Sequence, residues 1–375
     1  MTSVRKRGKY WEYTISYSDK FGNYKRKSKS GFYKKKDALE AGNELEKTFS
    51  SGVFIPFDIT LLDYISKWLK TYKLGKYSPV TEAGYRTMIT QLKSYFGTKR
   101  KINSISRSEW QQFLNTFGKT HARSTVSKIN NFVKNVVKSA VADQIIKFNF
   151  TEGAIISGKK SKNETLKYLQ EADFKKLKDY VFKNSSLDKI YNYIIAVGIL
   201  TGARYSEILA LTWNDIDFNK KQIKIDKSWD YTFTQNFKAT KTTSSRRIID
   251  VDPELITLLE KLKQEQAVYF EKIQQPISIN GMVFYDKHLN LLPDYIINKH
   301  LKRIEKELEI KPLITFHGLR HTHVSYLLSK GVDINYISHR LGHSNISITL
   351  RVYSHLLKEQ KESEANKAVK VLTAL

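Results

Sequence analysis

Two arginines in the second half of the chain each stand three residues from a polar partner. Glu207 follows Arg204, and His317 precedes Arg320. Side chains three residues apart share one face of a helix, so Glu207 is placed to orient the Arg204 guanidinium. A guanidinium fixed in this way presents a planar fork to the oxygens of a phosphate. Taken alone, each pair is explained equally well as an ordinary surface ion pair or a polar helix face.

Three histidines close to Arg320 raise the question of a zinc site. They are His317, His321 and His323. Zinc sites need three or four nitrogen, sulfur or carboxylate ligands. No carboxylate lies near these histidines in the sequence, and the chain has no cysteine. Because residues 321 and 323 also point to different faces of a helix, we expect no metal site here.

Lys241 lies in a polar turn rich in threonine and serine. Segments with strand character flank the turn, at Gln222–Lys227 and Arg246–Val251. Lys238 and Arg246 are further cations close by in the sequence. A lysine at such a turn is usually only solvated, so position alone assigns no function to Lys241.

A fourth motif, Leu-Gly-His-Ser, contains His343 and ends at Ser344. Ser344 is a candidate N-cap for a helix that runs through Tyr353, ten residues beyond His343. The chain has 22 tyrosines, so a single one of them is most simply interpreted as a packing residue.

In this order the six residues resemble the complete active-site set of the tyrosine recombinases, the phage integrase family: Arg204, Lys241, His317, Arg320, His343 and Tyr353. The Thr-Gly-x-Arg-x-x-Glu box, the Leu-Gly-His box and the closing tyrosine also match local sequences of that family. The resemblance implies an enzyme that cuts DNA through a covalent 3′-phosphotyrosyl link and leaves a free 5′-hydroxyl. Because that link conserves bond energy, it implies strand exchange without ATP, a metal or another cofactor.

Cleavage of a phosphodiester builds negative charge on the oxygens of phosphorus. Stabilising such developing charge is usually the largest catalytic contribution, and two-metal enzymes supply it with cations. The resemblance assigns this role to the guanidinium groups of Arg204 and Arg320, with Glu207 supporting Arg204.

The resemblance assigns the remaining steps to four side chains. Tyr353 is the nucleophile; a tyrosine has an unperturbed pKa of about 10, so it needs a cationic field and a proton acceptor. His317 is that acceptor, and His343 hydrogen-bonds the phosphate. Lys241 donates a proton to the departing 5′-oxygen.

The chain is strongly basic, with 64 Lys and Arg against 37 Asp and Glu and a net charge of +27 over 375 residues. This charge predicts a nucleic-acid partner, because neutralising phosphates releases counterions. A membrane surface is the competing partner, but no clear basic amphipathic helix or lipidation site is present. The longest apolar run, around Tyr193–Leu200, is too short to span a bilayer, and we see no apolar signal core at the N-terminus.

Changes in composition predict three domains. Residues 1–55 form the most basic block, in which Trp11–Tyr17 and Tyr24–Ser30 have strand character and residues 36–48 have helical spacing. This block predicts a small sheet with one helix and resembles the arm-site DNA-binding domain of integrases. Its candidate DNA contacts are Arg5, Lys6, Arg7, Lys25, Arg26 and Lys27.

Residues 56–155 predict a four-helix domain that resembles the core-binding domain of the family. The helices are expected around residues 61–69, 79–96, 110–117 and 129–137. Ser78 and Pro79 are the expected N-cap and first residue of the second helix. Residues 165–375 form the expected catalytic domain, mixed α/β but mostly helical, with a C-terminal tail. The fold class is therefore mainly α with small β elements.

The resemblance also implies partners and a location. The core-binding and catalytic domains would clamp a core site on double-stranded DNA, the first domain would bind arm sites, and four protomers would form the synapse. An excision factor and a host DNA-bending protein are further expected partners, and the expected location is the nucleoid in the cytoplasm of a bacterial host, away from membranes.

Two other functions compete with this interpretation. A type IB topoisomerase shares the chemistry but only relaxes DNA, and the basic first domain argues against it. A non-catalytic DNA-binding regulator of the same fold would not need the complete residue set.

Overall fold

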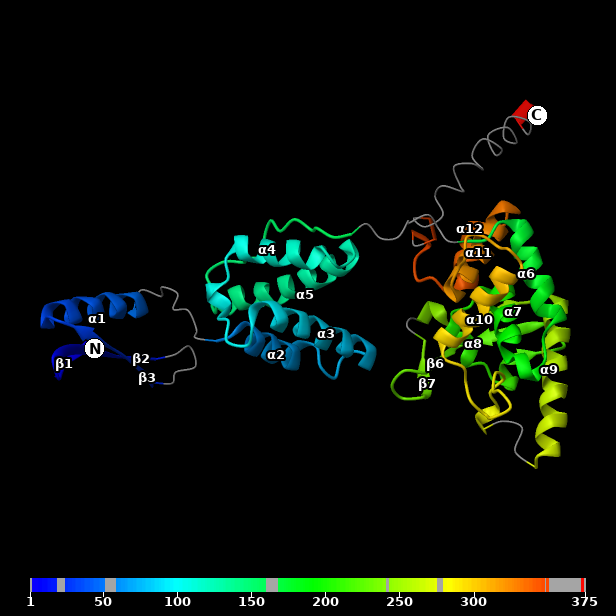
Figure 1. Cartoon of the computed structure of the whole chain (residues 1–375), viewed down its shortest axis with the longest axis horizontal. Helices are drawn as coiled ribbons and strands as arrows, with labels where there is room; N and C mark the ends of the chain where they lie inside the picture. The colour runs from blue at the N-terminus through cyan, green and yellow to red at the C-terminus, as the bar shows by residue number, and fades with distance from the viewer. Residues whose placement is uncertain are drawn as a thin grey trace. The chain divides into compact units, whose positions relative to one another are not determined.

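The computed structural model describes residues 2–18, 24–50, 59–159, 168–240, 243–274, 279–347, 349–350 and 372–373. The chain divides into two compact units, Met1–Lys162 and Asn163–Leu375. Helices dominate the described residues, and the strands are short (Figure 1). The predicted fold class, mainly α with small β elements, is confirmed.

The first unit begins with an antiparallel sheet of order β1-β2-β3 and one helix: β1 (Thr2–Arg7), β2 (Tyr10–Ser18), β3 (Tyr24–Phe32) and α1 (Lys35–Ser50). The helix covers the sheet, and Tyr13, Ile15 and Ala38 are buried between them. The strands β2 and β3 and the helix lie where the sequence predicted them. β1 was not predicted, because Val4 is the one apolar residue that its polar and basic sequence contains.

Among the residues that the structure describes, the remainder of the first unit contains four α-helices: α2 (Leu61–Tyr72), α3 (Pro79–Phe96), α4 (Arg107–Gly118) and α5 (Arg123–Ala142). All four were predicted, as were the Ser78 N-cap and the first-turn Pro79 of α3. Gly97 ends α3 with φ 71°, a backbone conformation that favours glycine. Aromatic side chains, among them Trp110 and Phe113, fill the core.

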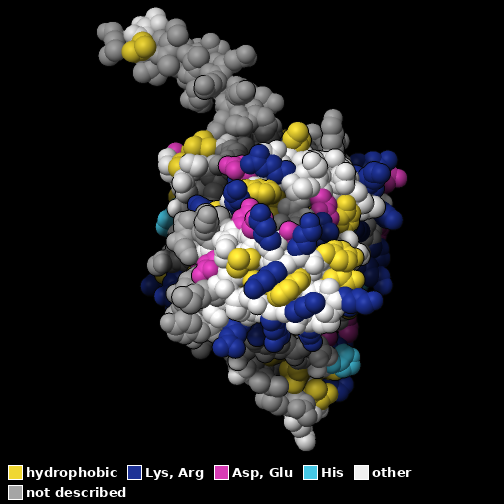
Figure 2. All heavy atoms as spheres, turned by 90° about the vertical axis from the view of Figure 1, so that its left-hand side faces the viewer, with side chains coloured by type: hydrophobic (Ala, Val, Ile, Leu, Met, Phe, Trp, Pro, Cys, Tyr) yellow, Lys and Arg dark blue, Asp and Glu magenta, His cyan; other side chains and the backbone are white. Residues whose placement is uncertain are grey.

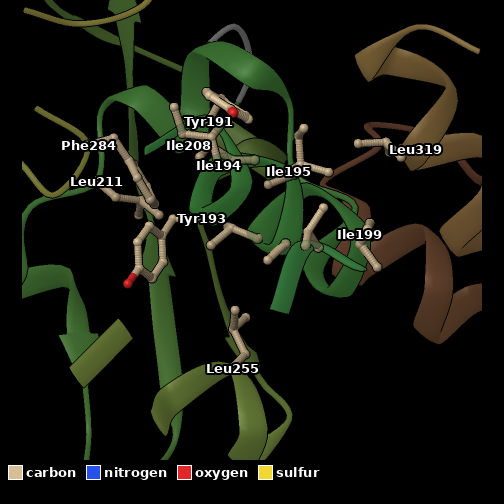
Figure 3. Close-up of a cluster of buried hydrophobic side chains, with 14 of the residues drawn as sticks. Tyr191, Tyr193, Ile194, Ile195, Ile199, Ile208, Leu211, Leu255, Phe284 and Leu319 are labelled. Carbon is tan, nitrogen blue, oxygen red and sulfur yellow. The ribbon is translucent and has the colours of Figure 1, made fainter. Parts of the chain in front are cut away.

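The second unit contains seven helices within the described ranges: α6 (Glu171–Lys183), α7 (Ile190–Thr201), α8 (Tyr205–Leu209), α9 (Pro253–Lys272), α10 (Asp294–Glu307), α11 (Phe316–Ser329) and α12 (Ile334–Leu341). All of α7 except Leu200 is buried, as expected for a helix that is apolar on every side. Figure 3 shows the α7 side chains Tyr193 and Ile195 in a cluster with Leu255 of α9 and Leu319 of α11. α7 is therefore the centre around which the site elements pack.

Two small sheets complete the second unit: β4 (Ile216–Asp217), β5 (Gln222–Ile225) and β8 (Arg247–Asp250) form one, and β6 (Lys227–Asp230) and β7 (Asn236–Ala239) form the other. β5 pairs directly with β8, so the two predicted strands are neighbours. The expected simple turn between them is wrong, since the hairpin of β6 and β7 is inserted there.

Short 3-10 helices occur in both units as η1 (Ile102–Ser104), η2 (Leu187–Lys189), η3 (Trp213–Asp215), η4 (Thr243–Ser245) and η5 (Ile279–Gly281).

Lys and Arg side chains are spread over much of the surface that Figure 2 shows. Asp and Glu side chains lie between some of them. Within the described ranges, no helix is both long enough and apolar enough to cross a membrane.

Candidate active site

Arg320, on α11, is held between the C-terminal ends of two other helices. Its Nη1 donates to the carbonyl oxygen of Gly202, which caps α7, and its Nη2 donates to the carbonyl oxygen of Leu341, the last residue of α12, both at 2.8 Å. Helix C-termini carry partial negative charge and therefore stabilise a buried guanidinium. Arg320 is only 4% exposed, so these contacts fix the plane of its fork before any substrate binds.

Arg204 is the N-cap residue of α8, and Glu207 holds it through both backbone and side chain. The Arg204 backbone N–H donates to Glu207 Oε2 at 3.0 Å, and Arg204 Nη1 donates to Oε1 at 2.7 Å. The Arg204 side chain remains 37% exposed, whereas that of Glu207 is 3% exposed. Burial raises the pKa of Glu207, but Arg247 and Arg204 outweigh it and hold that pKa below its usual value. Glu207 is thus a buried anion that anchors a cation open to solvent.

Two histidines lie close to these arginines. Desolvation, followed by the charges of Arg320 and Arg204, lowers the pKa of His317, in the first turn of α11. Burial lowers the pKa of His343 to about 4, with contributions from the same two arginines, and its Nδ1 hydrogen-bonds with Thr349 Oγ1 at 2.7 Å. The structure therefore brings two guanidinium groups and two imidazoles together, and both imidazoles are neutral at pH 7.

The other two histidines of the motif have different surroundings. His323 is buried; its Nδ1 bonds with the carbonyl oxygen of Ile199 at 2.9 Å, and its Nε2 accepts from Arg340 Nε at 3.2 Å. The ring of His321 meets that of His317 edge-on, with centroids 5.1 Å apart. Since both His323 nitrogens are engaged, the three histidines do not share a ligand position. Across the described ranges, no three His, Asp or Glu side chains form a metal-binding group.

Glycines in two of the motifs allow the site elements to approach each other closely. Gly202 has φ 63°, and a Cβ there would lie 2.8 Å from His323 Cδ2. Gly342 has φ 68°, and a Cβ there would lie 3.0 Å from Arg247 Nη1 and from Ser245 Cα. Both positions combine a left-handed backbone with no room for a side chain, which is the physical reason for glycine in each box.

Lys241 and Tyr353 lie outside the described residues, as does most of the C-terminal tail. Of the cations near Lys241 in the sequence, Lys238 has its Nζ 3.9 Å from Asp230 Oδ2 across the β6–β7 hairpin. Arg246 is exposed. The hairpin therefore supplies a partner for Lys238.

The helix after His343 begins one residue later than the sequence predicted. Asn345, rather than Ser344, accepts the Ser347 backbone N–H on its side-chain oxygen, at 2.8 Å. Residues 346–347 and 349–350 are helical. The prediction of Ser344 as the cap was wrong because asparagine, an equally good N-cap, stands next to it.

Sequence reasoning also missed Arg247 and Arg340, whose side chains contact the site elements. Arg340 Nη1 and Nη2 donate to the carbonyl oxygens of Asp250 and Leu200. Both arginines follow or precede other polar residues and carry no local pattern that separates them from surface cations.

The candidate DNA contacts of the first unit lie on the small sheet. Glu12, which is buried, pairs with Arg5 Nε at 2.9 Å and Arg7 Nη1 at 3.8 Å. Lys6, Arg26 and Lys27 are exposed on the outer strands, and the side chain of Lys25 lies outside the described set. The sheet therefore presents several cations, two of which share a buried carboxylate.

Comparison with protein families matches two parts of the chain. Residues 167–360 match the model of the phage integrase family, and residues 3–49 match the arm DNA-binding domain. The first match covers slightly more than half of the 375 residues and includes all six candidate catalytic positions.

Individual relatives are similar over most of their length. The tyrosine recombinase XerC-like protein of Caldanaerobacter subterraneus subsp. tengcongensis is 29% identical, with 96% of each chain covered. The ICEBs1 integrase of Bacillus subtilis is 28% identical, covering 74% of this chain and 73% of that protein. Among solved structures, the Tn1549 transposon integrase with transposon right-end DNA has a TM-score of 0.70 at 20% identity, over 82% of this chain and 99% of that one. A lambda integrase dimer on a core site gives 0.61 at 14% identity, over 93% of each chain.

Proposed function

The chain belongs to the phage integrase family, and from that premise we propose that it is a site-specific recombinase that integrates and excises a mobile element. It cuts and rejoins DNA through a covalent 3′-phosphotyrosyl intermediate. The observation that carries this proposal is the convergence of Arg204 and Arg320 with His317 and His343, two fixed cations with two neutral imidazoles. Such a group can neutralise and position one phosphate.

The two arginines stabilise the transition state. Arg320 is fixed by two carbonyl oxygens and Arg204 by Glu207, so neither has to reorganise as charge develops on the phosphorus oxygens. His343, neutral and partly buried, hydrogen-bonds the same phosphate. We assign these three side chains to binding the non-bridging oxygens.

Proton transfer accompanies the exchange of bonds at phosphorus. The Tyr353 hydroxyl oxygen attacks phosphorus while the bond to the 5′-oxygen breaks. His317 accepts the tyrosine proton, for which its lowered pKa keeps it unprotonated, and Lys241 gives a proton to the 5′-oxygen. The reverse steps, with a different 5′-hydroxyl, rejoin the strands.

The remaining parts of the chain bind DNA in this proposal. Residues 1–55 bind arm sites, residues 56–155 and 165–375 bind the core site, and four protomers assemble on two DNA segments. The solved Tn1549 and lambda integrases hold DNA, and one lambda integrase structure is a tetramer on a Holliday junction, which supports DNA and other protomers as partners. We further propose an excision factor and a host DNA-bending protein as partners, and action at the nucleoid in the bacterial cytoplasm.

A suicide DNA substrate, nicked so that the cleaved strand end diffuses away, tests the proposal. Wild type should form a denaturant-resistant protein–DNA adduct, and Tyr353→Phe should form none while it binds DNA normally. Tyr336→Phe, a change at the exposed Tyr336 of α12, is the matched control and should retain the adduct. An adduct from Tyr353→Phe would refute the assignment. Exchange between two cognate sites then separates a recombinase from a topoisomerase.

A further inference from the structure

Arg247, at the start of β8, contacts several of the site elements, yet the proposed reaction assigns it no function. Its side chain is 0% exposed. Nη2 donates to Glu207 Oε2 at 3.0 Å, Nε donates to the Arg340 carbonyl oxygen at 2.6 Å, and Nη1 donates to the Ser245 carbonyl oxygen at 2.9 Å. One guanidinium thus joins three segments that are far apart in the sequence.

Each of these segments leads directly to a proposed catalytic residue. Glu207 holds Arg204. Ser245 ends η4, the turn that follows Lys241 in the chain. Arg340 lies three residues before His343, and Gly342 packs so closely on Arg247 Nη1 that an added Cβ would lie 3.0 Å from it. The guanidinium therefore lies where the three segments meet.

We infer that Arg247 is a positioning residue, which sets Arg204, the turn η4 and the segment of His343 in one common geometry. It acts on Arg204 through Glu207 and does not touch the substrate. A lysine in its place could not reach all three acceptors in this arrangement, because its donors share one nitrogen, whereas a guanidinium spreads its donors over a fixed planar fork. The inference rests on the proposed recombinase function, and it explains how motifs that are separate in the sequence are held in fixed positions relative to one another.

Arg247→Met tests this coupling by removing the donors while keeping a long apolar side chain. Covalent capture by each variant is measured on two suicide substrates. One has the ordinary scissile phosphate, and the other has a methylphosphonate, in which a neutral methyl group replaces a charged non-bridging oxygen. If Arg247 acts through Glu207 and Arg204, capture on phosphate should fall about a hundredfold, the effect of a small misplacement of a catalytic group. On methylphosphonate, which has less charge to neutralise, the loss should be at least about tenfold smaller.

A double-mutant cycle with Glu207→Gln identifies the route. Arg247→Met and Glu207→Gln should both lower capture on phosphate, and the double variant should lose less than the product of the two single losses, because Arg247 acts on Arg204 through Glu207. Multiplying losses would overturn the inference. The double variant also decides the case if Arg247→Met alone does not fold, because it leaves no unpaired carboxylate buried at position 207. The double variant should then also lose less covalent capture on methylphosphonate than on phosphate.

Gln266→Met is the matched control, because it also removes a buried side chain that makes more than one hydrogen bond. Gln266 is fully buried and donates through Nε2 to the carbonyl oxygens of Val283 and Tyr285, away from the site residues. It should leave the ratio of the two capture rates at the wild-type value. If Arg247→Met also kept the wild-type ratio of capture rates on phosphate and methylphosphonate, the role of Arg247 would be purely structural and the inference would be overturned. Failure of wild type to form any adduct would instead overturn the proposed function.

Discussion

Replacing Glu305 by glutamine should make the second unit more stable at pH 8 and remove a pH dependence of its stability. Glu305 is fully buried on α10, and its two carboxylate oxygens accept the backbone N–H of Ile314 at 3.1 and 3.2 Å. Burial raises the pKa of this carboxyl group to about 7. Ile314 lies two residues before α11, which carries His317 and Arg320, so the carboxyl group supports the approach to the site.

The magnitude follows from the difference between the folded and unfolded pKa values of Glu305. The folded value of about 7 exceeds the reference value of 4.5, so between these two values the folded state binds more protons than the unfolded state. The contribution of Glu305 to stability is therefore largest below pH 4.5, decreases as pH rises, and reaches a constant lower level above about pH 7. The full loss is about 3 kcal/mol, of which roughly 2–3 kcal/mol falls between pH 5 and pH 8. Glutamine cannot ionise, yet its side-chain oxygen can still accept the Ile314 N–H.

Native-state hydrogen exchange of the α11 amides measures the free energy of opening at pH 5, 6, 7 and 8 in both proteins. The difference between Glu305→Gln and wild type should grow with pH by about 2–3 kcal/mol. Glu307→Gln, a change of the exposed carboxylate two residues further along α10, is the control and should follow wild type at every pH. Parallel curves for Glu305→Gln and wild type would show that the buried carboxyl group does not titrate in this range, and would refute the argument.

Three further predictions concern the proposed reaction. Arg204→Ala and Arg320→Ala should each lower the rate of covalent capture about a hundred- to thousandfold, since one donor to a developing oxyanion contributes about 3–4 kcal/mol; unchanged affinity in gel shifts would separate this loss from lost binding, and a loss of affinity alone would contradict it. Lys241→Ala should be rescued by a substrate with sulfur in place of the scissile 5′-oxygen, because a thiolate leaves without a proton; rescue of Lys238→Ala instead would move the role to Lys238. Deletion of residues 1–55 should leave core-site cleavage intact but abolish integration that requires arm sites, as measured on substrates with and without those sites; normal integration by the truncated protein would make the first block a non-specific tail.

Local patterns were sufficient for elements whose apolar spacing or end signals are strong. The four helices of the first unit repeat apolar residues at helical spacing, and Ser78, Pro79 and Gly97 mark the ends of one of them. The six candidate catalytic residues were assigned differently: each local motif alone is weak, and only their order along the chain resembles the active-site set of the phage integrase family.

Features decided by tertiary contacts could not be predicted from the sequence. β1 is a strand because β2 offers it a partner, although its own sequence is polar. In the sequence, Arg247 follows Arg246 and cannot be told from a surface arginine. It becomes buried only when α8, β8 and α12 pack together. Glu305 likewise follows the apolar Leu301 and Ile304 along α10, and its burial depends on the loop that ends at Ile314.

The pairing of β5 with β8 has a consequence for how this enzyme can diversify. Ile225 lies directly opposite Arg247. The chain therefore leaves the sheet after β5 and re-enters it at β8 at neighbouring positions, and the β6–β7 hairpin lies in the segment between them. A change in the length of the exposed turn between β6 and β7, at residues 231–235, lengthens only a surface loop, whose closure entropy grows slowly with length. It leaves Arg247 opposite the same residue of β5. The turn between β6 and β7 can therefore accumulate insertions and deletions, while Arg247 and the elements that it contacts keep their positions.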